Sequence, residues 1–409
     1  MNLPTQTELL LPLLDVLAEN GPMRARDACD AVAERIGLPA EARAATVRVG
    51  PREEEVKVFD RKVRWTRQNA VLADLVAPAG WGVWSLTQTG AKTDRMAKPS
   101  VVVTVYQSPD GALLWAEAKS AVQYVEDGAV TCVLTSPPYP LVKPRVYDED
   151  ISDWRPEHYL TTLLDHIELF RPKLAPDGCF VLNLGPTFMP GAGVRNAYQH
   201  RLLTALVDNL GWNLIDEHYW FNPTKPRSSD YVTKKRTHCV NGIEPVYLLS
   251  PNGRTKCCNL RVLNPYTSRH RRLIGSGGEI VRSASPSQIQ TPGIRHRRDN
   301  GGCIPGNLHV MPPDRDLAYR RYCAQVGVEQ HPAMMPQKLA EFFIQFTTEP
   351  GDLVWDPFGG SAKTAAAALR LDRRFLISER YLDNLRGAMC RLPAVGYLAG
   401  SPERDLLAV

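Results

Sequence analysis

Several features that would define a protein class are missing from this sequence of 409 residues. No stretch approaches the roughly 20 consecutive apolar residues that a membrane-spanning helix needs. Thr5, Gln6 and Glu8 stand where a signal peptide would carry basic residues, so we expect no signal peptide. The nine cysteines form no Cys-x-x-Cys pair, and the adjacent Cys257 and Cys258 have poor spacing for a metal. We therefore expect reduced thiols, a cytoplasmic protein and no metal site.

Acidic residues are scarce in one part of the chain. The formal net charge of +5 is weak evidence for a nucleic-acid partner when taken alone. Between Arg254 and Arg298, however, Glu279 is the one acidic residue among many Lys and Arg, with Gly, Ser and Pro interleaved. Two interpretations fit this segment, namely a solvated loop and a region that contacts DNA phosphates and bases.

The first 98 residues have the pattern of a separate small domain. Thr5-x-x-Glu8 is a capping-box pattern ahead of leucines at helical spacing. Further helices are predicted over residues 23–36 and 62–75, and residues 80–87 alternate like one strand of a hairpin. Three helices followed by a hairpin are typical of a winged helix. A helical dimerisation or packing domain is the alternative.

From residue 101 onward, predicted strands alternate with predicted helices. Strands are expected over residues 101–106, 129–134, 179–184, 212–219, 245–249, 353–355 and 375–377. Helices are expected over residues 159–170, 198–210, 335–346 and 363–371. The polar residues 91–100 are typical of a linker, and residues 174–178 of a turn. The alternation predicts an α/β fold with a doubly wound, mostly parallel sheet.

The run Thr135-Ser136-Pro137-Pro138-Tyr139 closes one of these strands. The exocyclic amino nitrogen of a DNA base is a poor nucleophile, because its lone pair is delocalised into the ring. Acceptors beside its two N–H groups would localise that lone pair, and the Ser136 side chain and the Pro137 carbonyl suit this, since the prolines fix the backbone. Tyr139 would stack on a base that has left the duplex. Taken alone, the run is also compatible with a simple strand-ending turn.

A second motif stands between a predicted strand and a predicted helix. It reads Asp356-Pro357-Phe358-Gly359-Gly360-Ser361. Glycines permit close approach of a ligand, and the following helix N-terminus favours a carboxylate. Glu379 ends the next strand, where α/β pockets place an acid that binds ribose hydroxyls. This succession predicts a pocket for S-adenosylmethionine. A P-loop is excluded, because it needs glycine where Pro357 and Ala362 stand.

Together and in this order, the two motifs resemble those of the β-class amino-DNA methyltransferases, and Ser136 resembles the N4-cytosine branch. The resemblance extends through most of residues 110–390. It implies that His331 and Pro332 line the methionine end of the cofactor and that Glu117 lies near its adenine. The residues Arg64-Trp65-Thr66 and Gly82-Val83-Trp84 resemble the N-terminal domain of Mrr-type restriction proteins, which implies DNA binding.

The resemblance implies a Rossmann-like methyltransferase with an N-terminal winged helix and an inserted target-recognition region. The expected boundaries are residues 1–98 for the winged helix, 101–250 for the catalytic half, 251–325 for target recognition and 326–409 for the cofactor half. The implied substrate is double-stranded DNA, with the methyl group going to N4 of a flipped cytosine. The candidates for DNA contact are Arg269, Arg271, Arg272, Arg295, Arg297 and Arg298. Because arginine favours guanine, a G·C-rich target is expected.

Alternatives remain open at this point. The sequence has no Pro-Cys dipeptide, which excludes the cysteine nucleophile of C5-cytosine methylation. An N6-adenine methyltransferase would share nearly every feature. A catalytically inactive DNA-binding protein also fits, because Ala362 and Lys363 stand where the family has Gly and Thr. The sequence shows no nuclease signature, so a cognate restriction endonuclease would be a separate polypeptide, and a homodimer is left open.

Overall fold

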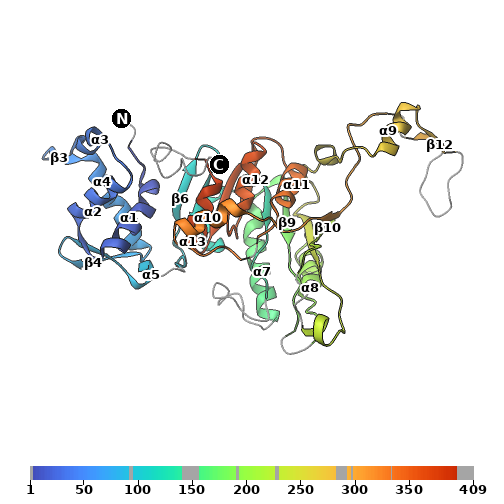
Figure 1. Cartoon of the computed structure of the whole chain (residues 1–409), viewed down its shortest axis with the longest axis horizontal. Helices are drawn as coiled ribbons and strands as arrows, with labels where there is room; N and C mark the ends of the chain where they lie inside the picture. The colour runs from blue at the N-terminus through green and yellow to red at the C-terminus, as the bar shows by residue number, and fades with distance from the viewer. Residues whose placement is uncertain are drawn as a thin grey trace.

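The computed structural model describes residues 3–91, 95–140, 156–189, 193–225, 230–281, 293–295, 298–332 and 334–393. Its N-terminal domain, a long central sheet with helices on both faces, and a segment that projects from the far end follow one another across the molecule (Figure 1). No helix in these ranges is both long and apolar enough to cross a membrane.

The N-terminal domain is a winged helix with one added hairpin. Its helices are α1 (Gln6–Asn20), α2 (Ala25–Arg35), α3 (Ala40–Ala44) and α4 (Val58–Leu72). A small sheet has the order β1 (Met23–Arg24), β5 (Val83–Leu86), β4 (Val76–Gly80), and the added hairpin joins β2 (Thr46–Val49) to β3 (Glu54–Lys57). The capping box is present, since the Glu8 amide donates to Thr5 Oγ1 at 3.3 Å and the Thr5 amide to Glu8 Oε2 at 2.7 Å.

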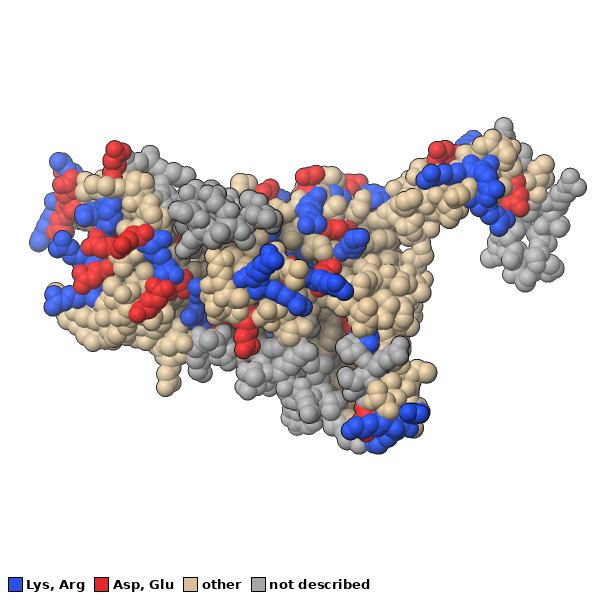
Figure 2. Space-filling view, in the orientation of Figure 1, with Lys and Arg blue, Asp and Glu red and all other residues tan. Residues whose placement is uncertain are grey.

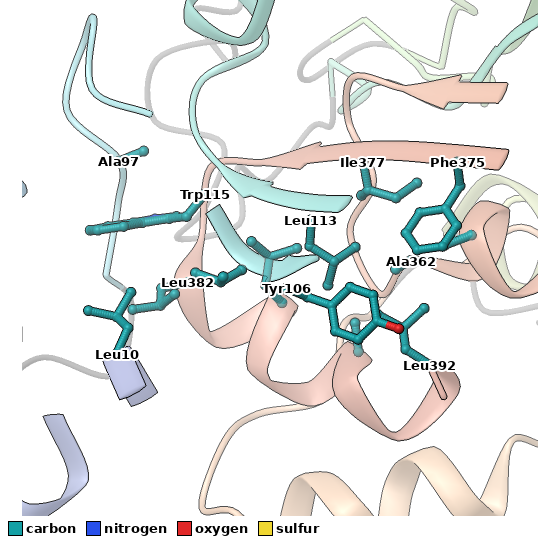
Figure 3. Close-up of a cluster of buried hydrophobic side chains, with 14 of the residues drawn as sticks. Leu10, Ala97, Tyr106, Leu113, Trp115, Ala362, Phe375, Ile377, Leu382 and Leu392 are labelled. Atoms are coloured by element: carbon teal, nitrogen blue, oxygen red, sulfur yellow. The ribbon is translucent and has the colours of Figure 1, made fainter. Parts of the chain in front are cut away.

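The predicted linker, residues 91–100, is not a free tether in its described part. The Ala97 amide donates to the Arg380 carbonyl, and Met96 forms a β-bridge with Tyr381. Ala97 is buried, and Figure 3 shows it with Leu10 of α1 near Trp115 and Leu382 of the larger domain. The polar composition predicted a linker, and this backbone pairing and burial show that the linker also holds the two domains together.

Nine strands form the central sheet, in the order β14-β10-β11-β9-β8-β15-β16-β7-β6. The pairs from β9 through to β7 are parallel, and antiparallel pairs flank them. The strands are β6 (Val103–Ser108), β7 (Gly111–Trp115), β8 (Val130–Thr135), β9 (Leu174–Asn183), β10 (Asn213–Phe221), β11 (Ile243–Ser250), β14 (Leu308–Val310), β15 (Leu353–Asp356) and β16 (Arg374–Glu379). The doubly wound, mostly parallel sheet is confirmed. The turn predicted over residues 174–178 is wrong, because β9 already begins at Leu174.

Helices cover both faces of the sheet. The helices are α6 (Ala118–Ala121), α7 (Pro156–Phe170), α8 (Tyr198–Thr204, continued as a π-helix over Ala205–Asn209), α10 (Leu317–Gln325), α11 (Gln337–Thr347), α12 (Lys363–Arg370) and α13 (Leu382–Ala388). Alternate strand residues enter different cores. Leu134 and Val354 pack with Phe343 of α11, whereas Val133 and Trp355 pack with Phe170 of α7. This alternation is the physical sign of a sheet buried on both faces.

The region expected for target recognition, residues 251–325, is partly built into the main domain. Lys256 pairs with Asp352 at 2.9 Å, Arg261 pairs with Glu349 at 2.7 Å, and β14 joins the sheet edge. A β-bridge between Asn264 and Cys303 closes the base of the projecting segment between these two residues. That part carries α9 (Ser268–Gly275), β12 (Glu279–Val281) and β13 (Gly293–Arg295), and it projects away from the sheet (Figure 1).

Candidate active site

A cavity of about 810 Å³ opens at the carboxyl ends of β8, β15 and β16. Because β15 pairs with β8, the turn after Thr135 and the turn after Asp356 face each other across more than two hundred residues of sequence. The cavity is lined by all the predicted catalytic and cofactor residues, namely Ser136, Pro137, Pro138, Tyr139, Glu117, His331, Pro332, Asp356, Pro357, Phe358, Gly359, Gly360, Ser361 and Glu379.

A hydrogen-bonded network surrounds the Ser136 hydroxyl. The Tyr139 hydroxyl lies 2.6 Å from Ser136 Oγ, 3.2 Å from Asn183 Oδ1 and 3.3 Å from Glu244 Oε2. The Lys225 ammonium donates to the other oxygen of Glu244 at 2.9 Å. Burial, and then the charge of Glu244, hold the pKa of Tyr139 well above its ordinary value. The phenol is therefore a neutral hydroxyl that can donate to one acceptor and accept from Ser136.

The Tyr139 ring packs directly against Gly185. A β-carbon built on Gly185 would overlap the ring, so only glycine allows it to rest there. The turn itself is held from α7, because the Tyr159 hydroxyl donates to the Pro138 carbonyl at 2.8 Å. These contacts fix the direction of the Ser136 and Pro137 acceptors before any ligand arrives.

Asp356 joins the two motifs rather than pointing only at a ligand. Thr135 Oγ1 donates to one carboxylate oxygen at 2.7 Å and Thr364 Oγ1 to the other at 2.7 Å. The Phe358 amide adds a third bond at 3.1 Å. Burial raises the pKa of this carboxyl to about 6. Asp356 therefore fixes the glycine turn against the end of β8, a role beyond the cofactor contact that the sequence predicts.

The glycine turn and Glu379 form the opposite wall. A β-carbon on Gly359 would overlap the Ile377 side chain, because the turn lies directly against β16. The Gly360 amide donates to Glu379 Oε2 at 2.7 Å, and the Tyr381 amide donates to Oε1 at 2.8 Å. Burial raises the pKa of Glu379 above its ordinary value. The Asn384 side-chain amide also donates to Oε1, at 3.2 Å, so Oε2 is the oxygen that keeps a lone pair for a ligand hydroxyl, because a carboxylate accepts about four hydrogen bonds.

The departure from the family pattern has a structural explanation. Ala362 takes the left-handed conformation, with φ 53°, that glycine adopts more readily. Lys363 is buried, and its ammonium donates to Asp314 Oδ2, which also accepts from the Gln337 amide at 2.7 Å. Burial lowers the pKa of Lys363. This ion pair between buried Lys363 and partly exposed Asp314 ties α12 to the segment before α10.

Of the remaining predicted residues, Glu117 lies at the cavity edge and the described arginines lie outside the cavity. Glu117, at the start of α6, lies 3.5 Å from the Arg380 guanidinium at the cavity edge. Arg269, Arg271 and Arg272 are exposed on α9, outside the cavity, and Arg298 is exposed nearby in the chain. Arg295 belongs to β13 by its backbone, and Arg297 lies outside the described residues.

Sequence reasoning missed Asn183, Gly185 and Lys225 as parts of the site. Asn183 ends β9, which neighbours β8, so a sheet order worked out in advance would have placed it beside Ser136.

In the described ranges, no group of three or more His, Cys, Asp or Glu side chains could hold a metal ion. A doubly wound sheet with both turns facing one cavity defines a Rossmann-like methyltransferase.

The comparisons with known proteins name the family. The family model for DNA methylases matches residues 130–388, and the model for the Mrr N-terminal domain matches residues 7–96. The chain belongs to the DNA methylase family.

Type II methyltransferase M.PvuII of Proteus hauseri is 31% identical over 292 residues, which are 68% of this chain and 86% of that protein. Orphan methyltransferase M.BamHII of Bacillus amyloliquefaciens is 46% identical over 269 residues, 63% of this chain and 88% of that one. The solved structure of PvuII DNA methyltransferase (cytosine-N4-specific) has a TM-score of 0.56 at 26% identity, and the match covers 72% of this chain and 89% of that one.

Proposed function

We propose that this DNA methyltransferase transfers a methyl group from S-adenosylmethionine to the N4 amino group of a cytosine extruded from double-stranded DNA. The observation that carries the proposal is the single cavity that joins the Ser136 network to the glycine turn and Glu379. The specificity named for the PvuII enzyme supports the choice of cytosine, as does serine at position 136.

The residues present fit S-adenosylmethionine. The cavity volume of about 810 Å³ lies within the ~300–1,000 Å³ usual for ligand pockets. Glu379 would hold the ribose hydroxyls, Glu117 would lie at the adenine, and the Gly359–Gly360 turn with His331 and Pro332 would hold the methionine end. When bound, S-adenosylmethionine supplies an activated methyl group.

The protein's part in the reaction is to prepare the nucleophile. Ser136 Oγ and the Pro137 carbonyl would each accept a hydrogen bond from the cytosine amino group, which localises the nitrogen lone pair, and after transfer the methylated nitrogen would lose one proton to solvent or a neighbouring group. Tyr139 would stack on the base with the ring face away from Gly185. No cysteine is among the residues that line the cavity in the described part of the chain, which agrees with direct transfer.

The same proposal assigns the remaining parts. Residues 251–325 would recognise the target, with the α9 arginines and Arg295, Arg297 and Arg298 on guanine or phosphate. Residues 1–98 would add DNA contacts. Residues 101–250 and 326–409 would form the catalytic and cofactor halves. We place the protein in the cytoplasm, within a restriction–modification system whose endonuclease is a separate polypeptide, and a homodimer is the oligomeric state to test.

The direct test is incubation with S-adenosylmethionine and unmethylated plasmid DNA, followed by nucleoside mass spectrometry. N4-methylcytosine is the expected product. N6-methyladenine would keep the cavity and its roles but refute the choice of base. Transfer to no base on random-sequence DNA, with cofactor binding intact, would identify an inactive DNA-binding protein.

A further inference from the structure

A second projection, separate from α9, hangs beneath α8 in Figure 1. We call it the lower lobe and define it by the described residues of 186–195 and 230–238. Its core is aromatic, because the Phe188 and Tyr231 rings stack with centroids 6.0 Å apart and His238 meets both rings edge-on. Gly193 leaves the space that the Tyr231 ring occupies, and a bridge joins Phe188 to Arg195. The lower lobe is therefore a packed unit.

The tip of the lower lobe is basic. Lys234, Lys235 and Arg236 are consecutive and exposed, and Arg195 is exposed on the facing segment. In the described part of the lobe the acidic residue is Asp230, which lies 3.7 Å from Lys234 and 3.2 Å from Lys235. Four cations thus face one carboxylate. Figure 2 shows a blue cluster at this tip and another on the α9 projection.

Both roots of the lower lobe reach the active-site cavity. Gly185 and Pro186 line the cavity where the first segment of the lobe begins, and Asn222 and Lys225 line it shortly before the second segment, which begins at residue 230. The α9 projection instead leaves the domain at the Asn264–Cys303 bridge. In Figure 1 the two projections leave the molecule in different directions, α9 above and the lower lobe below.

We propose that the lower lobe is a second DNA-contacting surface, in which Arg195, Lys234, Lys235 and Arg236 bind backbone phosphates beside the extruded base. This inference rests on the proposed function, since it takes DNA as the substrate. Phosphate contacts fix the register of a duplex without reading its sequence. A lobe rooted at the cavity rim is placed to hold the strand whose base enters the cavity, while α9 contacts another part of the duplex. An acidic protein partner is the competing occupant.

The salt dependence of DNA binding tests this assignment. The variant Lys235→Gln/Arg236→Asn removes two cations but leaves Lys234 to pair with Asp230, and asparagine tolerates the positive φ of 56° at position 236. The matched control is Arg370→Gln/Arg374→Gln. Arg370 ends α12 and Arg374 begins β16, and both are exposed at the ends of these elements that lie away from the cavity.

Binding to a labelled duplex is measured by fluorescence anisotropy over a range of salt concentrations. Each lost phosphate contact reduces the slope of log K against log salt by about 0.9, so the lobe variant should lose about 2 and the control nothing. A single Arg195→Gln variant should lose about 1, which provides a second reading if the double variant folds poorly. Calorimetric affinity for S-adenosylmethionine should match the wild type in every variant that folds.

Two results would overturn the assignment, namely an unchanged slope in the lobe variant and an equal change in the control. An unchanged slope would leave an acidic protein as the partner of the tip. If the wild-type protein itself neither binds nor methylates DNA, the proposed function fails. If it does both and the lobe variant keeps the wild-type slope, only the lobe assignment fails.

Discussion

Removing the Tyr139 hydroxyl should separate its two proposed contributions. The hydroxyl lies within hydrogen-bond reach of Ser136, Asn183 and Glu244, at 2.6, 3.2 and 3.3 Å. Tyr139→Phe keeps the ring on Gly185 but leaves Ser136 without its closest partner. A hydrogen bond between neutral groups contributes about 0.5–1.5 kcal/mol. If the orientation of Ser136 depends on its bond with Tyr139, methyl transfer should slow by about 2- to 13-fold.

Tyr139→Ala also removes the ring. Stacking of a base on an aromatic side chain contributes about 1–3 kcal/mol, so this variant should be slower than Tyr139→Phe by a further factor of about 5 to 150. Affinity for the cofactor should not change, because the contacts of the Tyr139 side chain are with Ser136, Asn183, Glu244 and Gly185 and not with the glycine turn or Glu379. The assay is single-turnover transfer from radiolabelled S-adenosylmethionine to plasmid DNA, with calorimetric titration of the cofactor.

Gly185→Ala is the matched perturbation from the other side of the ring. Its β-carbon would overlap Tyr139, so the ring must move although every hydroxyl remains. We expect a loss of turnover at least as large as that of Tyr139→Phe. Wild-type turnover in Tyr139→Phe would refute the orienting role of the network. Equal rates for the phenylalanine and alanine variants would refute stacking.

Three further predictions concern stability. Thr135→Val removes a donor from the buried Asp356 and should lower the free energy of unfolding by about 1.5–3 kcal/mol. Because the pKa of Asp356 is about 6 and rises further without that donor, the loss should be larger at pH 8 than at pH 5 in urea unfolding; a pH-independent loss would contradict this. Gly359→Ala should overpack Ile377, costing about 1–3 kcal/mol and weakening calorimetric cofactor affinity, and a melting temperature and affinity equal to wild type would disprove the overlap. His309 is buried, and burial lowers its pKa to about 4. The unfolded chain, in which a histidine has its ordinary pKa of about 6.5, therefore binds the proton first, and the free energy of unfolding falls as the pH drops below about 6.5. Between pH 7 and pH 5 the wild type should lose about 2 kcal/mol more of this free energy than His309→Gln, and equal pH profiles would contradict this.

Much of the sheet could be predicted because its motifs stand at strand ends. A parallel sheet brings the carboxyl ends of its strands to one side, so the α/β alternation predicts that Ser136 and Asp356 lie on the same side of the sheet. Two strand assignments failed for identifiable reasons. Pro176, Asp177 and Gly178 are typical turn residues, and they form an irregularity inside β9, between Leu174, which pairs with Val130 of β8, and Cys179, which pairs with Cys132. Residues 111–115 are too short an apolar run to distinguish from a loop, and β16 pairing makes them β7.

The Ser136 network could not be found in the same way. Asn183, Lys225 and Glu244 come from or follow β9, β10 and β11, and in the sheet β11 lies between β9 and β10. Their convergence depends on the register of antiparallel pairs, and that register is set by packing rather than by any local motif. The ion pair of Lys363 and Asp314 could not be predicted for a related reason, since nothing in the sequence connects two residues that far apart.

The place of β15 between β8 and β16 has a consequence for synthesis of the protein. The cavity needs the turn after residue 135 and the wall that ends at Glu379, so a chain growing on the ribosome lacks a complete cofactor site until nearly all of it has emerged. Pairing across such a long sequence separation also makes this step slow compared with local helix formation. A chain stopped by a premature termination codon before β16 would carry the whole N-terminal domain and the Ser136 motif, yet it would lack the cavity wall that ends at Glu379. Methylation therefore requires a chain that extends through β16, and a product that ends before it cannot supply it.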